Sequence, residues 1–487
     1  MAIDQDSLEL CYLTVDEVLG RFRRRELSPP EYLETLIRRA EDVEPSVNAF
    51  TYTFFDEAMA SAAAAAERYA GDAAGLRPLE GLPLAVKELS AVAGQPQTLG
   101  SVALQDNVAD ASDVAIQRAI DAGAIVHART NTPEFGCASF THNELHGLTR
   151  NPWNLDYSPA GSSGGSAAAL AAGTTPLAQG TDSAGSLRLP ASACGIVGFK
   201  AAYGRVPLPH PLNLERCNHY GPMARSVRDV SILYRIMAGP HVGDLASWIP
   251  DGPGSAPAGG EGTFRRAAVV NVPRQLDVDH EVQANFDDAV ARLERRGVII
   301  EHAELSWSYD SLIEATEMAF TATYAPAVAA VRDLRPEALT SYAAAFLERV
   351  GPRAADRGPI LEANSYIGAL GAEIMQVLER VDVLLMPTLC FPAPLAGEEY
   401  RDAGPVVDGR SQPDRWIVGT TVPFNLLSQL PAISVPSGRA STGVPTGMQV
   451  IGRPYDEPTV LDLGARALQG EALFAAAATR PSLAAGG

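Results

Sequence analysis

Two lysines stand out in this chain as residues that could act as a base. Of the 38 basic residues only Lys87 and Lys200 are lysines, and the others are all arginines. Arginine stays protonated, whereas a buried lysine can lose its proton and then accept one from a nucleophile. For Lys200, a chance escape from the bias toward arginine is a sufficient explanation. Lys87 is the stronger candidate because segments rich in serine follow it.

Two clusters of glycine and serine could supply that nucleophile. They occupy residues 161–166 (GSSGGS) and 182–186 (DSAGS), on either side of a stretch of small residues that predicts a helix. Neither continues into the Gly-Lys-Ser/Thr of a P-loop, and neither has the G-x-G-x-x-G spacing of a dinucleotide site. Residues 161–165 match the G-x-S-x-G elbow of α/β-hydrolases. A five-residue match is weak evidence in a segment of this composition.

The order of the motifs is more specific than any one of them. Pro-x-x-Val-Lys ends at Lys87, the GSSGGS cluster follows, and Gly-Thr-Asp-x-x-Gly-Ser-x-Arg-x-Pro covers residues 180–190. Further pieces are ARTNTPEFG, LTRNPWN, VDVLLMPT, FNLLSQLPAISVP and GMQVIGRP. Together they resemble the amidase signature family over residues 81–453. The resemblance implies cleavage of carboxylic amides, and in some members of esters or carbamates, without a cofactor.

The resemblance also implies a Ser–cis-Ser–Lys triad. By motif position the nucleophile is Ser186, the bridging serine is Ser162 and the base is Lys87. In the family the bridging serine follows a cis peptide bond, which here would join Gly161 to Ser162. Chemistry alone does not decide between Ser162 and Ser163 as the bridge, and the family position favours Ser162. The alternative for Ser186 is a serine that only forms a turn.

A lysine base imposes a physical condition on its surroundings. A serine hydroxyl is a poor nucleophile until a base removes its proton. Lys87 could do so only when neutral, far from the ordinary lysine pKa of about 10.4. Lowering that pKa by roughly three units corresponds to about 4 kcal/mol, which requires burial away from water. The apolar residues 82–86 that precede Lys87 predict such burial.

The second cluster is expected to stabilise negative charge on the reacting carbonyl oxygen. The resemblance implies an oxyanion hole made by the backbone N–H groups of Ser183, Ala184, Gly185 and Ser186. Donors aimed at developing charge are usually the largest catalytic contribution. Position 184 is alanine where many family members carry glycine. We expect this methyl group to narrow the backbone angles open to the loop.

The neighbours of the triad are expected to support it. Asp182 could act as a base, but a structural role in orienting the loop is the preferred interpretation, with Arg188 as its buried partner. Thr181 is expected either to donate a hydrogen bond near the bridging serine or to be an ordinary core hydroxyl. Gln449, in the GMQVIGRP piece, is expected to pack in the core.

Other residues that could do chemistry lack the necessary context. His142 and His146 are four residues apart and could share a helix face, but zinc hydrolases need H-E-x-x-H, and Asn143 replaces the glutamate. No third ligand is evident, so no metal is predicted. A thiol nucleophile is possible at Cys137 or Cys194, but both lie among small apolar residues, which favours packing.

The elements that position these residues alternate between helices and strands. This rhythm predicts a single large α/β domain with a central mixed sheet covered by helices on both faces. Residues 1–75 are expected to form a helical segment on the core, and residues 76–487 the amidase signature domain, with a Gly/Pro-rich excursion at 251–262. Apolar spacing predicts helices at 13–24, 28–43, 55–71 and 278–297, and strands at 82–86, 124–128, 267–272, 298–305, 381–388 and 431–438.

The net charge argues against several classes of partner, and the cysteine usage indicates a reducing compartment. The formal net charge of −20 argues against nucleic acid and anionic membrane surfaces. The N-terminus has no basic region followed by an apolar core, and no stretch is long enough for a transmembrane helix. Five scattered cysteines are typical of a reduced protein. We therefore expect a cytoplasmic monomer or homodimer that acts on a small molecule.

The expected substrate is an amide or carbamate with an apolar or aryl group. Substrate choice is expected to reside in two variable segments, 206–223 and the helical stretch 309–370. The second segment carries six aromatic residues: Tyr309, Phe320, Tyr324, Tyr342, Phe346 and Tyr366. An alternative is the amidase component of a tRNA-dependent amidotransferase. A non-catalytic binding protein is disfavoured because Lys87, Ser162 and Ser186 are all present.

Overall fold

The computed structural model describes most of the chain. It covers residues 4–71, 75–249, 265–350, 358–400, 403–412, 419–468, 474 and 479–483. The excursion expected at 251–262 lies outside the described residues. In the described part, no helix combines the length and the apolar character needed to cross a membrane.

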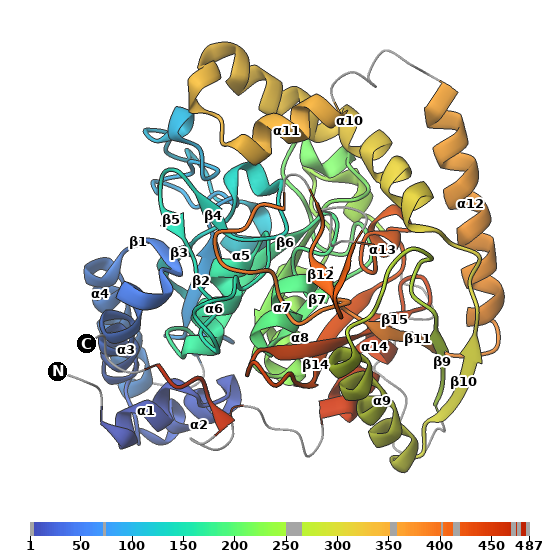
Figure 1. Ribbon diagram of the computed structural model, residues 1–487. Helices are drawn as coiled ribbons and strands as arrows, with labels where there is room; N and C mark the ends of the chain where they lie inside the picture. Colours follow the sequence, from blue (N-terminus) through green and yellow to red (C-terminus); the bar gives the residue numbers. More distant parts are fainter. Residues whose placement is uncertain are drawn as a thin grey trace.

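A mixed sheet runs through the centre of the molecule (Figure 1). Its eleven strands in the described part have the order β1-β3-β2-β6-β8-β7-β14-β15-β11-β9-β10. Strand β2 is parallel to β3 and β6, and β9 is parallel to β10 and β11, whereas the other pairings are antiparallel. The strands are β1 (Phe50–Thr53), β2 (Pro83–Lys87), β3 (Ile125–Thr130), β6 (Leu177–Asp182), β7 (Val197–Lys200), β8 (His219–Ala224), β9 (Arg266–Val270), β10 (Ile299–Ala303), β11 (Val383–Pro387), β14 (Ala432–Arg439) and β15 (Pro445–Gly452).

Helices cover both faces of this sheet, which confirms the predicted fold class. In β7, Gly198 faces Ala191 of α7, while Phe199 packs its ring against Tyr234 of α8. The helices are α1 (Gln5–Cys11), α2 (Val15–Arg24), α3 (Pro29–Val47), α4 (Phe55–Ala70), α5 (Val114–Asp121), α6 (Gly164–Ala172), α7 (Arg188–Cys194), α8 (Val227–Met237), α9 (His280–Arg295), α10 (Tyr309–Leu334), α11 (Ser341–Val350), α12 (Gly358–Leu378), α13 (Pro423–Leu426) and α14 (Glu457–Leu468). Two short hairpins, β4 (His142–Asn143) with β5 (Gly147–Leu148) and β12 (Val406–Val407) with β13 (Arg410–Ser411), lie outside the main sheet.

Local sequence explains where the N-terminal helices begin. Ser28 caps α3 through the Glu31 N–H, and the Glu31 carboxylate in turn accepts from the Ser28 N–H. This reciprocal capping box, with Pro29 in the first turn, satisfies donors that a helix start leaves unpaired. The same arrangement starts α2 at Thr14. All the helices and strands predicted above are present, with ends shifted by a few residues.

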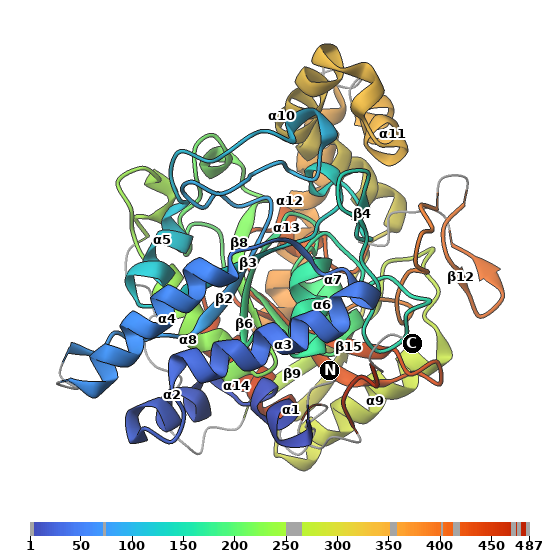
Figure 2. The same ribbon diagram turned by 90° about the vertical axis from the view of Figure 1, so that its left-hand side faces the viewer.

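The N-terminal helices and the helices α10 to α12 lie at opposite sides of the molecule (Figures 1 and 2). Arg39 of α3 donates to the Ala172 carbonyl at the end of α6 at 2.9 Å, and the Tyr12 hydroxyl donates to the Ala171 carbonyl at 3.1 Å. The N-terminal segment therefore packs against the core helix that follows the first glycine-serine cluster. The domain boundary at residue 75 stays a prediction.

Candidate active site

Lys87 lies at the buried end of β2, next to both glycine-serine clusters. Its side chain is 0% exposed. The Nζ atom is 2.7 Å from Ser162 Oγ, 3.0 Å from Ser163 Oγ and 2.8 Å from Thr181 Oγ1. Parallel pairing of β2 with β6 aligns Val86 with Gln179, which brings Lys87 beside Thr181. The lysine, the first cluster and the start of the second are therefore in direct contact.

Burial changes the protonation of Lys87. Loss of water lowers the pKa of Lys87 well below its ordinary range, and the nearby Asp182 charge opposes this shift only in part. Every residue of β2 is buried, as the apolar run predicted. A neutral amine is thus accessible to Lys87 at a pH where a surface lysine is charged.

Glycines allow the first cluster to fold tightly at this point. The Gly161–Ser162 peptide bond is cis, as the family resemblance implied. A Cβ on Gly161 would lie 2.4 Å from the Phe140 carbonyl oxygen, so no larger residue fits there. Ser163 Oγ accepts from the Thr181 N–H and donates to the Thr181 carbonyl, both at 3.2 Å. Because these contacts engage Ser163, Ser162 is the better candidate for transferring protons from Lys87.

The second cluster curls around the carboxylate of Asp182. Arg188 donates to both carboxylate oxygens, at 3.0 and 3.1 Å. The backbone N–H groups of Gly185 and Leu187 donate to the same carboxylate at 2.7 and 3.2 Å, and Asn425 donates at 2.9 Å. Burial alone would raise the pKa of Asp182, but Arg188 and these hydrogen bonds outweigh it and hold the group ionised. These contacts give Asp182 and Arg188 the structural arrangement predicted for them.

This arrangement alters one detail expected of the oxyanion loop. The Gly185 N–H already donates to Asp182, so in this conformation it is not available to a substrate. The N–H groups of Ser183, Ala184 and Ser186 are the remaining candidates. Ala184 keeps a negative φ, so its methyl group does not force the loop into a left-handed conformation and lies instead in a pocket wall. Gly185 has φ +118°, which favours glycine.

Gln449 is buried in the core as expected, and its side-chain amide also makes polar contacts. Its Oε1 accepts from Arg188 at 3.2 Å, and its Nε2 donates to the Thr420 carbonyl at 2.5 Å. Arg188 also donates to the Thr421 carbonyl at 3.0 Å. Gln449 therefore helps to fix the arginine that anchors the loop, a role that the sequence motif alone did not reveal.

Ser186 lines a pocket whose largest side chains are aromatic. Its carbonyl accepts from the Ser163 N–H at 3.2 Å, which joins the two clusters. In the described part of the chain, the Ser162 and Ser186 hydroxyls do not hydrogen-bond to each other. The empty volume of the pocket, including the solvent space at its open mouth, is about 660 Å³. Its lining residues are Gly136, Cys137, Ala138, Ser139, Phe140, Ser183, Ala184, Ser186, Phe320, Tyr324, Tyr342, Phe346 and Glu399.

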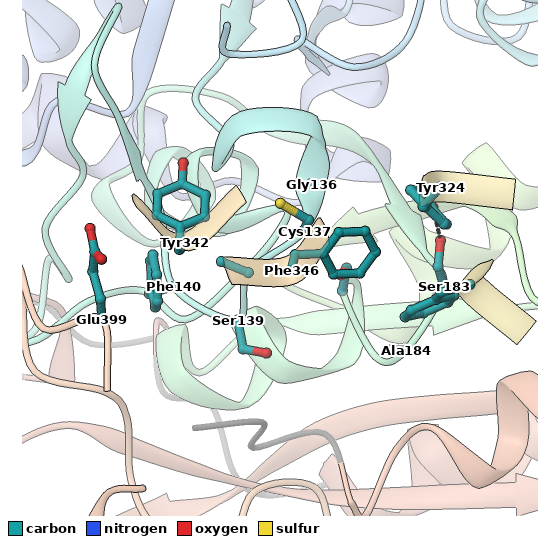
Figure 3. A pocket seen from close by; sticks show the side chains of 13 residues that line it. Gly136, Cys137, Ser139, Phe140, Ser183, Ala184, Tyr324, Tyr342, Phe346 and Glu399 are labelled. Atoms are coloured by element: carbon teal, nitrogen blue, oxygen red, sulfur yellow. Dashed lines mark hydrogen bonds between the residues drawn. The ribbon is translucent and has the colours of Figure 1, made fainter. Parts of the chain in front are cut away.

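Four of the six aromatic residues singled out in segment 309–370 line this pocket, and two do not. Tyr309 is the first residue of α10 and is buried, and the Tyr366 hydroxyl accepts from the Ser308 N–H at the start of that helix. Sequence reasoning missed Phe140 and Glu399. Phe140 follows the ARTNTPEFG motif closely, and that position was the available signal. Figure 3 shows Phe140, Tyr342 and Glu399 on one side of the pocket, and Tyr324 and Ser183 on the other.

Several known proteins are similar to this chain in sequence and fold. The Amidase family profile matches residues 31–461. The chain belongs to this family. It is an amidase, a hydrolase of amide carbon–nitrogen bonds.

The chain is 33% identical to an acylamidase of Rhodococcus erythropolis, over 93% of the chain and 94% of the relative. It is 34% identical to a glutamyl-tRNA(Gln) amidotransferase subunit of Symbiobacterium thermophilum, over 91% of the chain and 93% of the relative. Its fold is similar to that of a bacterial aryl acylamidase, with a TM-score of 0.85, 26% identity, and coverage of 95% and 96%.

The histidine pair of this amidase does not lie on a helix. His142 belongs to β4 and His146 to the turn before β5, so their four-residue spacing does not place them on one helical face. His142 instead contacts Glu399 at 3.2 Å and stacks on Phe140. Among the described residues, the one cluster with the spacing of a metal site is Asp279, His280 and Asp408, at the surface.

The cysteines and the second lysine also have defined places in this amidase. Cys137 is not simply buried, because it lines the pocket and donates to the Glu134 carbonyl at 3.1 Å. Cys194 is buried as predicted, and burial raises the pKa of its thiol. Lys200 is buried, and it donates to the Leu430 carbonyl at 2.8 Å. Burial lowers the pKa of Lys200 to about 7.

Proposed function

We propose that this amidase cleaves a linear amide with Ser186 as nucleophile, Ser162 as bridging serine and Lys87 as base. The observation that carries the proposal is the 2.7 Å contact between the buried Lys87 Nζ and Ser162 Oγ, next to the pocket that Ser186 lines. Within the described part of the chain, the Lys87 amine hydrogen-bonds to hydroxyl groups and not to a carboxylate that would hold its charge in place. Such surroundings suit a base better than a structural cation.

We propose the following proton transfers, the first of which is supported by the contact between Lys87 and Ser162. Neutral Lys87 accepts the Ser162 proton while Ser162 accepts that of Ser186, and Ser186 Oγ then attacks the carbonyl carbon. The N–H groups of Ser183, Ala184 and Ser186 are proposed to stabilise the resulting oxyanion. Ser162 delivers its proton to the leaving amine, and Lys87 restores the proton on Ser162. Water then attacks the acyl-enzyme by the same route, which releases the acid.

The pocket favours an apolar or aryl group on the substrate. Five aromatic side chains line it: Phe140, Phe320, Tyr324, Tyr342 and Phe346. Flat aromatic walls match an aryl group by stacking or edge-to-face contact. The likeness to a bacterial aryl acylamidase supports the same substrate class. An aryl amide is therefore the proposed substrate, with an aryl ester or carbamate as close alternatives.

The second candidate function is that of an amidotransferase component. It is favoured by the 34% identity to the Symbiobacterium amidotransferase protein, which spans almost the whole chain. Such an activity would need partner subunits and tRNA, with glutamine as the amide. The net charge of −20 weighs against direct contact with a polyanion.

The deciding experiment is arylamine release from an acyl anilide and an aryl carbamate by the purified chain, without ATP, tRNA or metal. Wild type is compared with Ser186→Ala, and with Ser441→Ala as a surface serine control. Release that Ser186→Ala abolishes and Ser441→Ala leaves intact would support a self-sufficient amidase. No release from wild type on either substrate, with glutaminase activity appearing only alongside partner subunits, would favour the amidotransferase.

A further inference from the structure

Ser183, the first residue of the proposed oxyanion loop, is held by two side chains that come from distant parts of the chain. Its hydroxyl donates to the Asn218 side-chain oxygen and lies 2.5 Å from the Tyr324 hydroxyl. Tyr324 also donates to the same Asn218 oxygen at 2.6 Å. The three side chains form a closed group at one side of the pocket, and Figure 3 shows the contact between Ser183 and Tyr324.

The sheet places Asn218 next to the loop. Strands β6 and β8 pair so that Asp182 lies opposite His219, and Asn218 is therefore beside Ser183. The Asn218 Nδ2 donates to the Glu215 carboxylate, which can only accept. That contact turns the Asn218 oxygen toward Ser183 and Tyr324. The Asn218 oxygen can accept from either hydroxyl, and each hydroxyl has one proton to donate, so two of the three contacts are hydrogen bonds at any one time.

The other anchors of the loop lie further along it. The Asp182 carboxylate holds the Gly185 and Leu187 N–H groups, and the Thr421 hydroxyl donates to the Ala184 carbonyl at 2.6 Å. The side-chain contacts of Ser183 hold the start of the loop on the side that faces the pocket. They restrain Ser183, whose backbone N–H belongs with that of Ala184 to the proposed oxyanion hole.

We propose that Asn218 and Tyr324 are positioning residues for the oxyanion loop and act through Ser183. The inference rests on the proposed function, because it concerns the N–H groups that would stabilise the oxyanion. Asn218 belongs to segment 206–223 and Tyr324 to segment 309–370, the two segments expected to select the substrate. Tyr324, which lines the pocket, would therefore also influence the rate of the chemical step, because a misaligned donor stabilises the oxyanion poorly.

The first test uses a fluorophosphonate, which forms a bond between phosphorus and an activated serine oxygen as fluoride leaves. Intact-protein mass spectrometry gives the second-order rate of Ser186 labelling without knowledge of the natural substrate. Tyr324→Phe keeps the ring in the pocket but removes the hydroxyl, and Ser183→Ala removes the other partner. We expect each to slow labelling about tenfold to a hundredfold. The double variant should be less impaired than the product of the two single losses, because both changes remove the Ser183–Tyr324 contact.

The second test separates positioning from general loosening. With an anilide substrate, Tyr324→Phe should lower kcat while KM changes less than twofold. Ser183→Thr keeps the hydroxyl that Ser183→Ala removes, so its kcat should lie within threefold of wild type. Tyr366→Phe is the matched control, because it also removes a tyrosine hydroxyl. That hydroxyl contacts Ser308 at the start of α10, outside the pocket. Circular dichroism and thermal unfolding check that each variant folds.

Each outcome has a defined meaning. Labelling of all variants at the wild-type rate, or additive losses in the double variant, would overturn the positioning role alone. An equal loss in Tyr366→Phe would reduce it to a stability effect and also overturn it. Failure of wild type to be labelled at Ser186 or to release arylamine would instead overturn the proposed function.

Discussion

Replacing Lys87 by methionine should remove activity and also change how stability depends on pH. Methionine has a similar length and no charge, so it fills the buried site at the end of β2. Loss of a general base typically lowers the rate 10²- to 10⁴-fold, which corresponds to about 3–5 kcal/mol of transition-state stabilisation. The pH dependence of stability is the more specific consequence.

The proposed mechanism requires Lys87 to be neutral in the folded protein, and its buried setting lowers its pKa well below the ordinary range. In the unfolded chain the same lysine has its usual pKa of about 10.4. Between the lowered pKa and 10.4 the unfolded state binds more protons, so the free energy of unfolding rises with pH. A Lys87 that is neutral in the folded protein throughout pH 8 to 10 would add about 2–3 kcal/mol over this range.

Lys87→Met lacks this contribution, while the other titrating groups are common to both proteins and cancel in the comparison. Urea unfolding of wild type and variant at pH 8, 9 and 10 measures the difference. The wild type should gain about 2–3 kcal/mol relative to the variant across this range. Parallel pH dependences would show that Lys87 keeps its proton in the folded protein. That result would refute its role as a neutral base.

Three other substitutions test the remaining parts of the site. Asp182→Ala should lower the free energy of unfolding by about 3–5 kcal/mol in urea titrations, because it leaves the buried Arg188 charge unpaired; a loss under about 1 kcal/mol would contradict this. Gly185→Ala would place a methyl group 2.1 Å from Thr421 Oγ1 at φ +118°, so arylamine release should fall more than about 100-fold, and near-normal release would show that the loop conformation is unimportant. Phe346→Ala should raise KM for an anilide about tenfold but hardly affect a small aliphatic amide, as steady-state kinetics would reveal; equal effects would remove the pocket's aromatic preference.

Sequence patterns fixed the local structure because their causes are local. The Ser28-Pro29 start of α3 and the apolar run of β2 act through neighbouring residues, and both elements formed as predicted. The same run required Lys87 to be buried, since it ends a strand with no polar face. Ordered motifs also identified the family, because the glycines and serines that a tight active-site loop needs occur at fixed spacing.

Only the tertiary structure decided which of these residues meet. Lys87 and Ser162 are 75 residues apart, and Ser183 and Tyr324 are 141 apart. Such contacts depend on strand register and helix packing, which no local pattern encodes. The spacing of His142 and His146 suggested a shared helix face, but they lie around a hairpin. The use of the Gly185 N–H by Asp182 likewise depends on how the folded loop turns, because hydrogen-bond partners are set by distance in space rather than by order along the chain.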